Sequence, residues 1–350
     1  MSVGTSLRYV LAVALTVALF LFAIRLLGSA TDALTPFLRR ALDRVVVGDW
    51  SALGLSWLAT YLLANGSLVA ALSLSLFTAG LVPSSQLFLM IVGSRLGAAA
   101  VVVFIGAFDY LNAELDTLRE STRLGLLTFL LTHSVYVPVL VVGYVSLPLV
   151  QSLPGPDGSV PDGGVAAPDP LSGLTEAVVA VVGPRVAFLL AFGCILLSLQ
   201  LFDRLLDAVD KQRLRRRSIR DLNDKWMSFG IGLLLTGLTT SVAFSLGVVV
   251  PLYNRGHIKR TEIMPFLLGA NIGTLVDTLV VAVALDTPTG VAMVTALLGI
   301  SFVISVLLLL AYPTYSRVIG AIQREILADQ RYFVGFLLAL VLVPLGFVLL

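Results

Sequence analysis

The sequence predicts an all-α polytopic membrane protein built as two inverted-topology repeats, each with a re-entrant helical hairpin. Three observations lead to this prediction: an apolar composition, long apolar runs, and a repeat at a fixed offset. Of the 350 residues, 58% are hydrophobic and 13% are charged, and the mean hydropathy is +0.99. Soluble domains are about 45–50% apolar and about 25% charged. The low charge therefore excludes a water-soluble enzyme, and the high hydrophobicity excludes a disordered chain.

Apolar runs long enough to cross a bilayer, which takes about 20 residues, predict about seven full spans. The first run is longer than the apolar region of a signal peptide, which is about 7–15 residues, so it is expected to be a retained helix. The predicted spans are 7–28, 86–108, 123–150, 177–202, 262–285, 290–312 and 332–350.

Two further apolar stretches, 51–82 and 227–252, are interrupted in the middle by small polar residues. The interruptions are Asn65-Gly66-Ser67 in the first stretch and Thr239-Thr240-Ser241 in the second. An interrupted backbone at membrane depth is tolerated only where protein or a watery cavity satisfies its polar groups. Both stretches are therefore predicted to be re-entrant hairpins with polar tips.

The connecting segments predict the orientation in the cell membrane. Residues 203–225 carry eight Lys and Arg residues and are expected in the cytoplasm, whereas the Pro/Gly/Asp-rich segment 151–176 has none and is expected outside. Counting spans from these segments places the N-terminus in the cytoplasm and the C-terminus outside. Arg39, Arg40 and Arg44 then lie outside, against the rule, so residues 36–46 are expected to form an amphipathic interfacial helix.

The chain matches itself without gaps at an offset of 176 residues. This offset divides it into a first transmembrane repeat (1–150), the external loop (151–176) and a second repeat (177–350). Because residues 50 and 226 are predicted on opposite sides of the membrane, the copies are expected to be inverted, with substrate bound between them. The matching pairs are Trp50 with Trp226, Gly54 with Gly230, Thr60 with Thr236, Gly80 with Gly256, Gly93 with Gly269, and Gly97 with Gly273.

The segment 267–274, with Gly269-Ala270-Asn271-Ile272-Gly273-Thr274, resembles the GANIGT-type signature of the sodium/phosphate cotransporter family. In that family each repeat carries this element downstream of a hairpin with a Q-S-S-S tip. The spacing from tip to glycine is equal here, from Ala64 to Gly93 and from Thr240 to Gly269. The resemblance implies sodium-coupled symport of inorganic phosphate by alternating access at the two tips, with no cofactor and sodium as the coupling ion.

The chain departs from the family pattern at both tips and in the first signature. The first tip reads Ala64-Asn65-Gly66-Ser67 and the second Thr240-Ser241-Val242-Ala243, so neither glutamine is present. Arg95 stands where the first copy should have asparagine, and Asp277 follows the second signature. Two alternatives therefore remain: a transporter of another small solute without sodium coupling, or a membrane scaffold or sensor that does not transport.

The candidate site follows from what each ion requires. Phosphate needs directed donors such as helix N-termini, and sodium needs oxygen acceptors. The candidate substrate-binding residues are Asn65, Gly66, Ser67, Arg95, Thr239, Thr240 and Ser241. The candidate ion-binding or coupling residues are Asn271, Thr274 and Asp277.

Arg95 and Asp277 stand inside apolar spans, where a charge costs at least about 2.5–3.5 kcal/mol, so they are predicted to form an ion pair. In one version of this hypothesis the guanidinium replaces a lost sodium and neutralises Asp277. In the other version Arg95 is a fixed cation that binds an anionic substrate through two parallel hydrogen bonds.

Other function classes lack support in the sequence. It has no nucleotide-binding loop, no metal-ligand spacing and no paired nucleophile and base, so an enzyme is not expected. Cys194 cannot form an internal disulfide, and His133 is expected to be a packed histidine rather than a proton relay. The net charge of +2 does not indicate a nucleic-acid partner, which leaves the lipid bilayer and a small anion as expected partners. The oligomeric state is not indicated.

Overall fold

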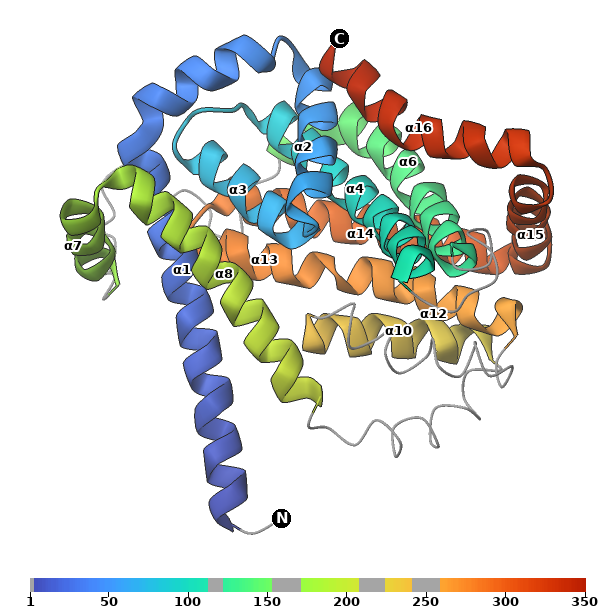
Figure 1. Ribbon diagram of the computed structural model, residues 1–350, viewed down its shortest axis with the longest axis horizontal. Helices are drawn as coiled ribbons and strands as arrows, with labels where there is room; N and C mark the ends of the chain where they lie inside the picture. Colours follow the sequence, from blue (N-terminus) through green and yellow to red (C-terminus); the bar gives the residue numbers. More distant parts are fainter. Residues whose placement is uncertain (1–2, 113–121, 153–170, 208–223, 241–258) are drawn as a thin grey trace.

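The computed structural model describes residues 3–112, 122–152, 171–207, 224–240 and 259–350, and every regular element in them is helical (Figure 1). The helices are α1 (Val3–Val45), α2 (Asp49–Leu63), α3 (Gly66–Thr78), α4 (Ser84–Asn112), α6 (Arg123–Ser152), α7 (Ser172–Val182), α8 (Pro184–Asp207), α10 (Lys225–Thr239), α12 (Arg260–Gly273), α13 (Leu275–Ala284), α14 (Pro288–Leu310), α15 (Tyr312–Ala328) and α16 (Gln330–Val348).

Within the described residues, seven stretches of helix are long and apolar enough to cross a membrane. They correspond to the seven predicted spans, with two internal differences. The predicted span 177–202 is divided at Gly183, where φ is +82°, so that the crossing helix α8 begins at Pro184. The predicted span 262–285 is interrupted at Thr274, between α12 and α13.

The first helix extends well beyond the predicted span. Residues 36–45 do not form a separate interfacial helix, as the sequence predicted for 36–46, but continue α1. Pro36 lies within this helix and removes one backbone hydrogen bond, which gives a local cause for the bend of α1 that Figure 1 shows.

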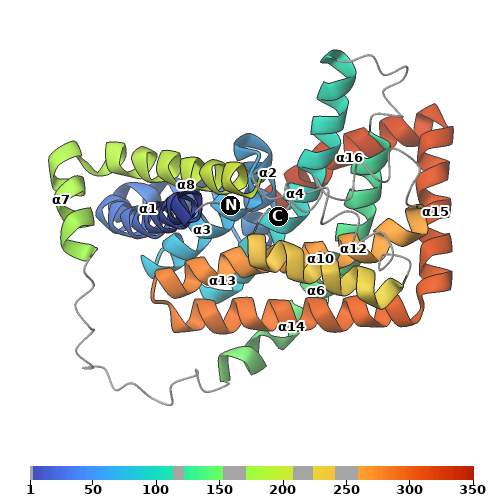
Figure 2. The same cartoon turned by 90° about the horizontal axis from the view of Figure 1, so that it is seen from below.

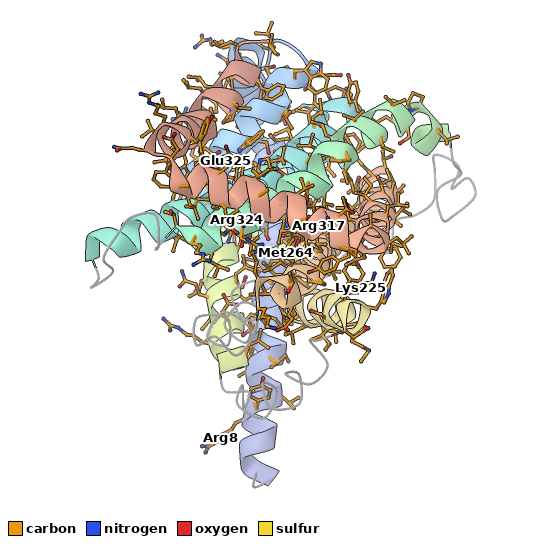
Figure 3. All side chains as sticks on the ribbon, turned by 90° about the vertical axis from the view of Figure 1, so that its right-hand side faces the viewer. Arg8, Lys225, Met264, Arg317, Arg324 and Glu325 are labelled. Atoms are coloured by element: carbon orange, nitrogen blue, oxygen red, sulfur yellow. The ribbon has the colours of Figure 1, made fainter. Side chains whose placement is uncertain are left out.

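α15 is an amphipathic helix between the predicted spans 290–312 and 332–350. It buries Tyr315 and Ile319 and exposes Arg317. Figure 3 shows Arg317 and Arg324 at the end of the molecule where Lys225 begins α10. The Lys225 ammonium group donates to the carbonyl of Leu309, the last turn of α14. The start of α10 therefore lies beside the end of α14, which leads into α15.

Helix bounds recur at the offset of 176 residues that the sequence showed. α2 and α10 are both 15 residues long, and adding 176 to Asp49 and Leu63 gives Lys225 and Thr239. The residue after each helix, Ala64 or Thr240, adopts the left-handed conformation with φ of +48°. The same shift carries the start of α4, Ser84, onto the start of α12, Arg260. The counterpart of α3 lies outside the described residues.

Two glycines one repeat apart make the same close helix contact. A Cβ atom on Gly97 of α4 would lie 2.7 Å from the carbonyl oxygen of Trp57 and 2.7 Å from Cβ of Thr60, both in α2. A Cβ atom on Gly273 of α12 would lie 2.8 Å from the carbonyl oxygen of Leu233 and 2.9 Å from Cβ of Thr236, both in α10. The absence of a side chain lets each pair of backbones approach closely, as in many membrane helix pairs.

The starts of α2 and α10 lie near opposite ends of other helices. Trp50, at the start of α2, stacks on Phe347 at the end of α16, with ring centroids 6.0 Å apart, and on Tyr144 late in α6. By contrast, Lys225 contacts the end of α14, which leads into α15. Gln323 of α15 donates to the carbonyl of Arg123, where α6 begins.

The most buried spans are α4 and the α12–α13 segment, whereas α8 and α16 expose most of their apolar side chains. Figure 2 shows α14 running alongside α12 and α13, with α10 on their other side. Exposed apolar faces on outer helices suit contact with lipid. The centre of the bundle therefore lies where α3, α4, α6, α12 and α13 meet.

We predict that Gly97→Ala and Gly273→Ala each destabilise the protein, because the added methyl group has to displace backbone atoms of α2 or α10. A destabilisation of about 1–3 kcal/mol is expected for such overpacking. The measurement is the melting temperature of the purified protein in detergent. Gly299→Ala in α14 is the matched control, since no atom lies within 4 Å of its added Cβ. An unchanged melting temperature in both test variants would contradict the close contact.

Candidate functional site

A buried ion pair joins the two halves of the chain. Arg95 Nη2 lies 3.5 Å from Asp277 Oδ1, and the two side chains are only 5% and 4% exposed. The ion pair predicted from the sequence is thus present. A single charge inside a membrane protein is costly, and here each side chain supplies the counter-charge of the other.

A threonine that the sequence reading did not select completes this pair. Arg95 Nη2 donates to Thr278 Oγ1 at 2.7 Å, and Thr278 Oγ1 in turn donates to Asp277 Oδ1 at 2.9 Å. The second terminal nitrogen, Nη1, donates to the backbone carbonyl of Thr274 at 3.3 Å. Thr278 was not among the candidates, although its position directly after Asp277 in an apolar span could have indicated it. Both terminal nitrogens of the guanidinium are therefore used within the protein.

The first polar tip contacts the same carboxylate. Ser67, in the first turn of α3, donates a short hydrogen bond from its hydroxyl to Asp277 Oδ2. The carboxylate thus lies at the N-terminus of α3, where the helix dipole favours negative charge. Asn65 has a local role: its Oδ1 accepts from the backbone N–H of Leu68 at 2.9 Å and caps α3. Gly66 is buried, and a Cβ atom there would lie 2.8 Å from the carbonyl oxygen of Ser94.

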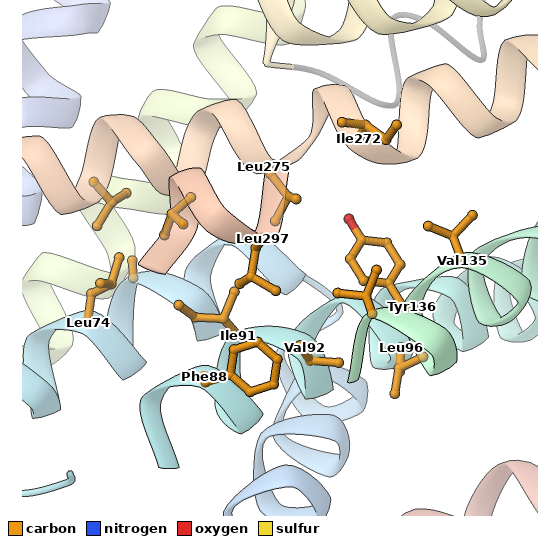
Figure 4. Packing of buried hydrophobic residues seen from close by; sticks show 14 of the residues in the cluster. Leu74, Phe88, Ile91, Val92, Leu96, Val135, Tyr136, Ile272, Leu275 and Leu297 are labelled. Atoms are coloured by element: carbon orange, nitrogen blue, oxygen red, sulfur yellow. The ribbon is translucent and has the colours of Figure 1, made fainter. Parts of the chain in front are cut away.

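The break between α12 and α13 supplies backbone groups for side-chain contacts. The carbonyl of Asn271 accepts from Thr274 Oγ1 at 2.7 Å and from the Tyr136 hydroxyl at 3.0 Å. Figure 4 shows the Tyr136 hydroxyl directed from α6 toward the chain between Ile272 and Leu275. Thr132, one turn before Tyr136, donates to Asn271 Oδ1 at 3.2 Å. The sequence did not predict a role for Thr132 or Tyr136, although their spacing of four residues places them on one helix face.

Two buried nitrogens at this break have no hydrogen-bond partner among the described residues. They are Nε of Arg95 and Nδ2 of Asn271. Both residues contact Thr274. Arg95 donates to the Thr274 carbonyl, and the Asn271 carbonyl accepts from the Thr274 hydroxyl. Buried donors are normally satisfied, so these two indicate a place where a ligand or water can accept hydrogen bonds.

The second polar tip is only partly described. Thr239 is buried and donates to the carbonyl of Leu235 at 2.5 Å, and Thr240 ends α10 in the left-handed conformation. Thr240 and Asp277 share the wall of a cavity of about 220 Å³, whose other walls are mainly apolar side chains of α1 and α8. Ser241, the remaining candidate of this tip, lies outside the described residues. The structure therefore brings Ser67, Arg95, Thr240, Thr274 and Asp277 into one region.

His133 lies apart from this region. Its Nδ1 is 2.9 Å from the carbonyl of Phe129, and its ring stacks on that of Phe129 with centroids 3.7 Å apart. In the described part of the chain, no group of three His, Cys, Asp or Glu side chains is arranged to hold a metal ion.

We predict that Asp277→Asn destabilises the protein by about 3–5 kcal/mol, because it leaves the buried Arg95 guanidinium without a counter-charge. Combining it with Arg95→Met should recover most of this loss, since both charges are then absent. Melting temperatures of the two single variants and the double variant in sodium-free detergent buffer give the coupling. Additive losses in the double variant would show that the ion pair contributes nothing.

Comparisons with known proteins agree with the resemblance seen in the sequence. Residues 189–322 match the model of the Na+/Pi-cotransporter family. A stretch of 96 residues is 29% identical to a Bacillus subtilis (strain 168) protein described as "uncharacterized protein YqeW", and covers 27% of this chain and 31% of that protein. The chain thus matches about a third of that relative's length, and no solved structure matches it. The chain is thus similar to the Na+/Pi-cotransporter family over residues 189–322, which include Asn271, Thr274 and Asp277.

Proposed function

We propose that this protein is a secondary active transporter that carries inorganic phosphate across the cell membrane, coupled to sodium, by alternating access between two halves. The observation that carries the proposal is the pair of unpartnered buried nitrogens, Arg95 Nε and Asn271 Nδ2, beside a broken helix that the family match covers. Phosphate offers oxygen acceptors to such donors, and the guanidinium supplies the positive charge that an anion requires.

Inverted repeats are part of the proposal, and the helix ends support them. α2 begins beside the ends of α6 and α16, whereas α10 begins beside the end of α14, at the side where α15 meets the start of α6. Two helices of equal length, equal end conformation and related sequence thus start from opposite sides. Substrate sites of many secondary transporters lie between such copies, where interrupted helices meet.

The proposed orientation places the basic end of the bundle in the cytoplasm. Arg317 and Arg324 of α15 lie at the end where α10 starts, and the positive-inside rule assigns such an end to the cytoplasm. The Tyr9 hydroxyl near the start of α1 donates to the carbonyl of Leu205 near the end of α8, just before the basic segment. This contact supports a cytoplasmic N-terminus, and the C-terminal end of α16 then faces outside.

The tip of α3 is the element that we expect to move during transport. Ser67 belongs to the first half and Asp277 to the second, so their hydrogen bond crosses the interface between the halves. Breaking it would release the N-terminus of α3 from the carboxylate and expose the polar groups around Thr274. Re-entrant segments with interrupted backbone are tolerated where they line such a cavity. In this scheme the second tip, with Thr239, Thr240 and Ser241, performs the equivalent motion from the other side.

A second candidate is transport of a small anion without sodium coupling. It is favoured by Arg95, whose terminal nitrogens contact oxygen groups that would otherwise suit a cation. The two candidates differ in one measurable property. Uptake of labelled phosphate into proteoliposomes, with and without an inward sodium gradient, separates them: sodium-dependent uptake supports symport, and sodium-independent uptake supports the second candidate. No uptake under either condition would overturn both and leave a non-transporting membrane protein.

For uptake by the purified protein, we predict that Asn271→Ala lowers the initial rate at least 10-fold, because a donor to the anion is lost at the helix break. The effect corresponds to about 1.4 kcal/mol or more. Ser305→Ala in α14 is the matched control, because it removes another buried polar atom without a partner, away from the proposed site. Equal rates for Asn271→Ala and the unmodified protein would place the anion elsewhere.

A further inference from the structure

We infer that the oxygen groups around Arg95 form a site for a monovalent cation, and that the Arg95 guanidinium occupies it as a permanently attached cation. The site consists of the carbonyl of Thr274, the hydroxyl of Thr278 and the carboxylate of Asp277. The consequence for coupling rests on the proposed transport function, whereas the existence of the site does not.

The composition of this oxygen set is that of an alkali-cation site. The carbonyl comes from Thr274, the residue between α12 and α13, whose backbone stays in the right-handed helical region and whose carbonyl accepts from Arg95. Backbone carbonyls coordinate sodium in membrane transporters, and a carboxylate supplies the compensating negative charge. The carboxylate also accepts from Ser67, so its second oxygen is oriented by α3. Among the described residues, the positive charge next to this set comes from the Arg95 side chain of α4.

The hydrogen bonds of Arg95 distinguish the two hypotheses for its role, which are replacement of a sodium ion and binding of an anionic substrate. An arginine that holds phosphate bidentately presents two parallel N–H groups to it. Here Nη1 donates to Thr274 and Nη2 donates to Thr278, and among the described residues only Nε of the three guanidinium nitrogens has no partner. Both terminal nitrogens are therefore engaged by the protein's own oxygens, as a cation in a site would be.

The two halves contribute unequally to this arrangement. Adding 176 to 95 gives 271, so Arg95 corresponds to Asn271 in the second half. Subtracting 176 from 277 and 278 gives 101 and 102, where the first half has Val101 and Val102. At these equivalent positions the first half thus supplies the attached cation and two apolar side chains, and the second half supplies a neutral amide and two oxygen-bearing side chains. The cation and its site come from opposite halves and meet at the interface between them.

The consequence is that free sodium has no place at Asp277 in the unmodified protein. Removing the guanidinium should open the site, because Asp277 then lacks a counter-charge and the freed volume lies next to three oxygen groups. Arg95→Ala is expected to gain a sodium-binding site that the unmodified chain does not have.

The test is the melting temperature of the full-length purified protein in detergent, in sodium chloride and in choline chloride at equal ionic strength. Choline is too large for the site. We expect the Arg95→Ala variant to melt about 2–4 °C higher at saturating sodium, with a saturable dependence on its concentration. The double variant Arg95→Ala with Asp277→Asn should lose this response, because the carboxylate is absent. The unmodified protein should show no response that depends on Asp277.

Each result decides the inference. A folded Arg95→Ala variant whose melting temperature is the same in both salts would overturn it, as would a sodium response that survives Asp277→Asn. If Arg95→Ala does not fold, Arg95→Gln and Arg95→Lys replace it: glutamine removes the charge and should confer sodium dependence, whereas lysine keeps it and should not. Identical behaviour of these two variants would overturn the inference. Because the readout is stability, these results are independent of whether the protein takes up phosphate.

Discussion

A charge that leaves water has to find an opposite charge, and this constraint fixes how α3, α4 and α13 meet. Arg95 and Asp277 are almost completely buried and come from different halves of the chain. Thr274 and Thr278 fix the orientation of the Arg95 guanidinium, because they accept hydrogen bonds from its two terminal nitrogens. Once this pair is in place, the tip of α3 has one favourable position, with Ser67 on the free carboxylate oxygen. The local geometry of three helices therefore follows from one electrostatic requirement.

Helix interruptions provide the polar backbone that this requirement needs. A continuous helix uses nearly all its carbonyls internally, so it can offer few to a side chain from another helix. At the junction of α12 and α13, the carbonyls of Asn271 and Thr274 accept from Tyr136 and Arg95. The interruption after Ala64 lets α3 begin inside the bundle with Asn65 as its cap. Gly66 and Ile272, beside the two interruptions, are buried, whereas Ala64 itself is exposed.

The sequence predicted the spans, the offset of 176 residues and the Arg95–Asp277 pair, because each leaves a strong local or periodic signal. So few residues are charged that two charges within apolar runs were conspicuous. The partners Thr278, Thr132 and Tyr136 were not predicted, because threonine and tyrosine are ordinary in apolar spans and only the packing of α6 against α12 shows their role. The length of α1 was underestimated because Arg39, Arg40 and Arg44 indicated a separate interfacial helix, whereas these residues continue α1. The functions of the two tips, including Ser241, remain predictions.

The contacts at Gly97 and Gly273 constrain which parts of the molecule are free to shift. Where two backbones touch with no side chain between them, neither helix can slide or rotate without a steric clash. We therefore expect α2 and α4 to move together, and α10 and α12 likewise. Ala64 and Thr240, each in the left-handed conformation after α2 or α10, are then the expected hinges.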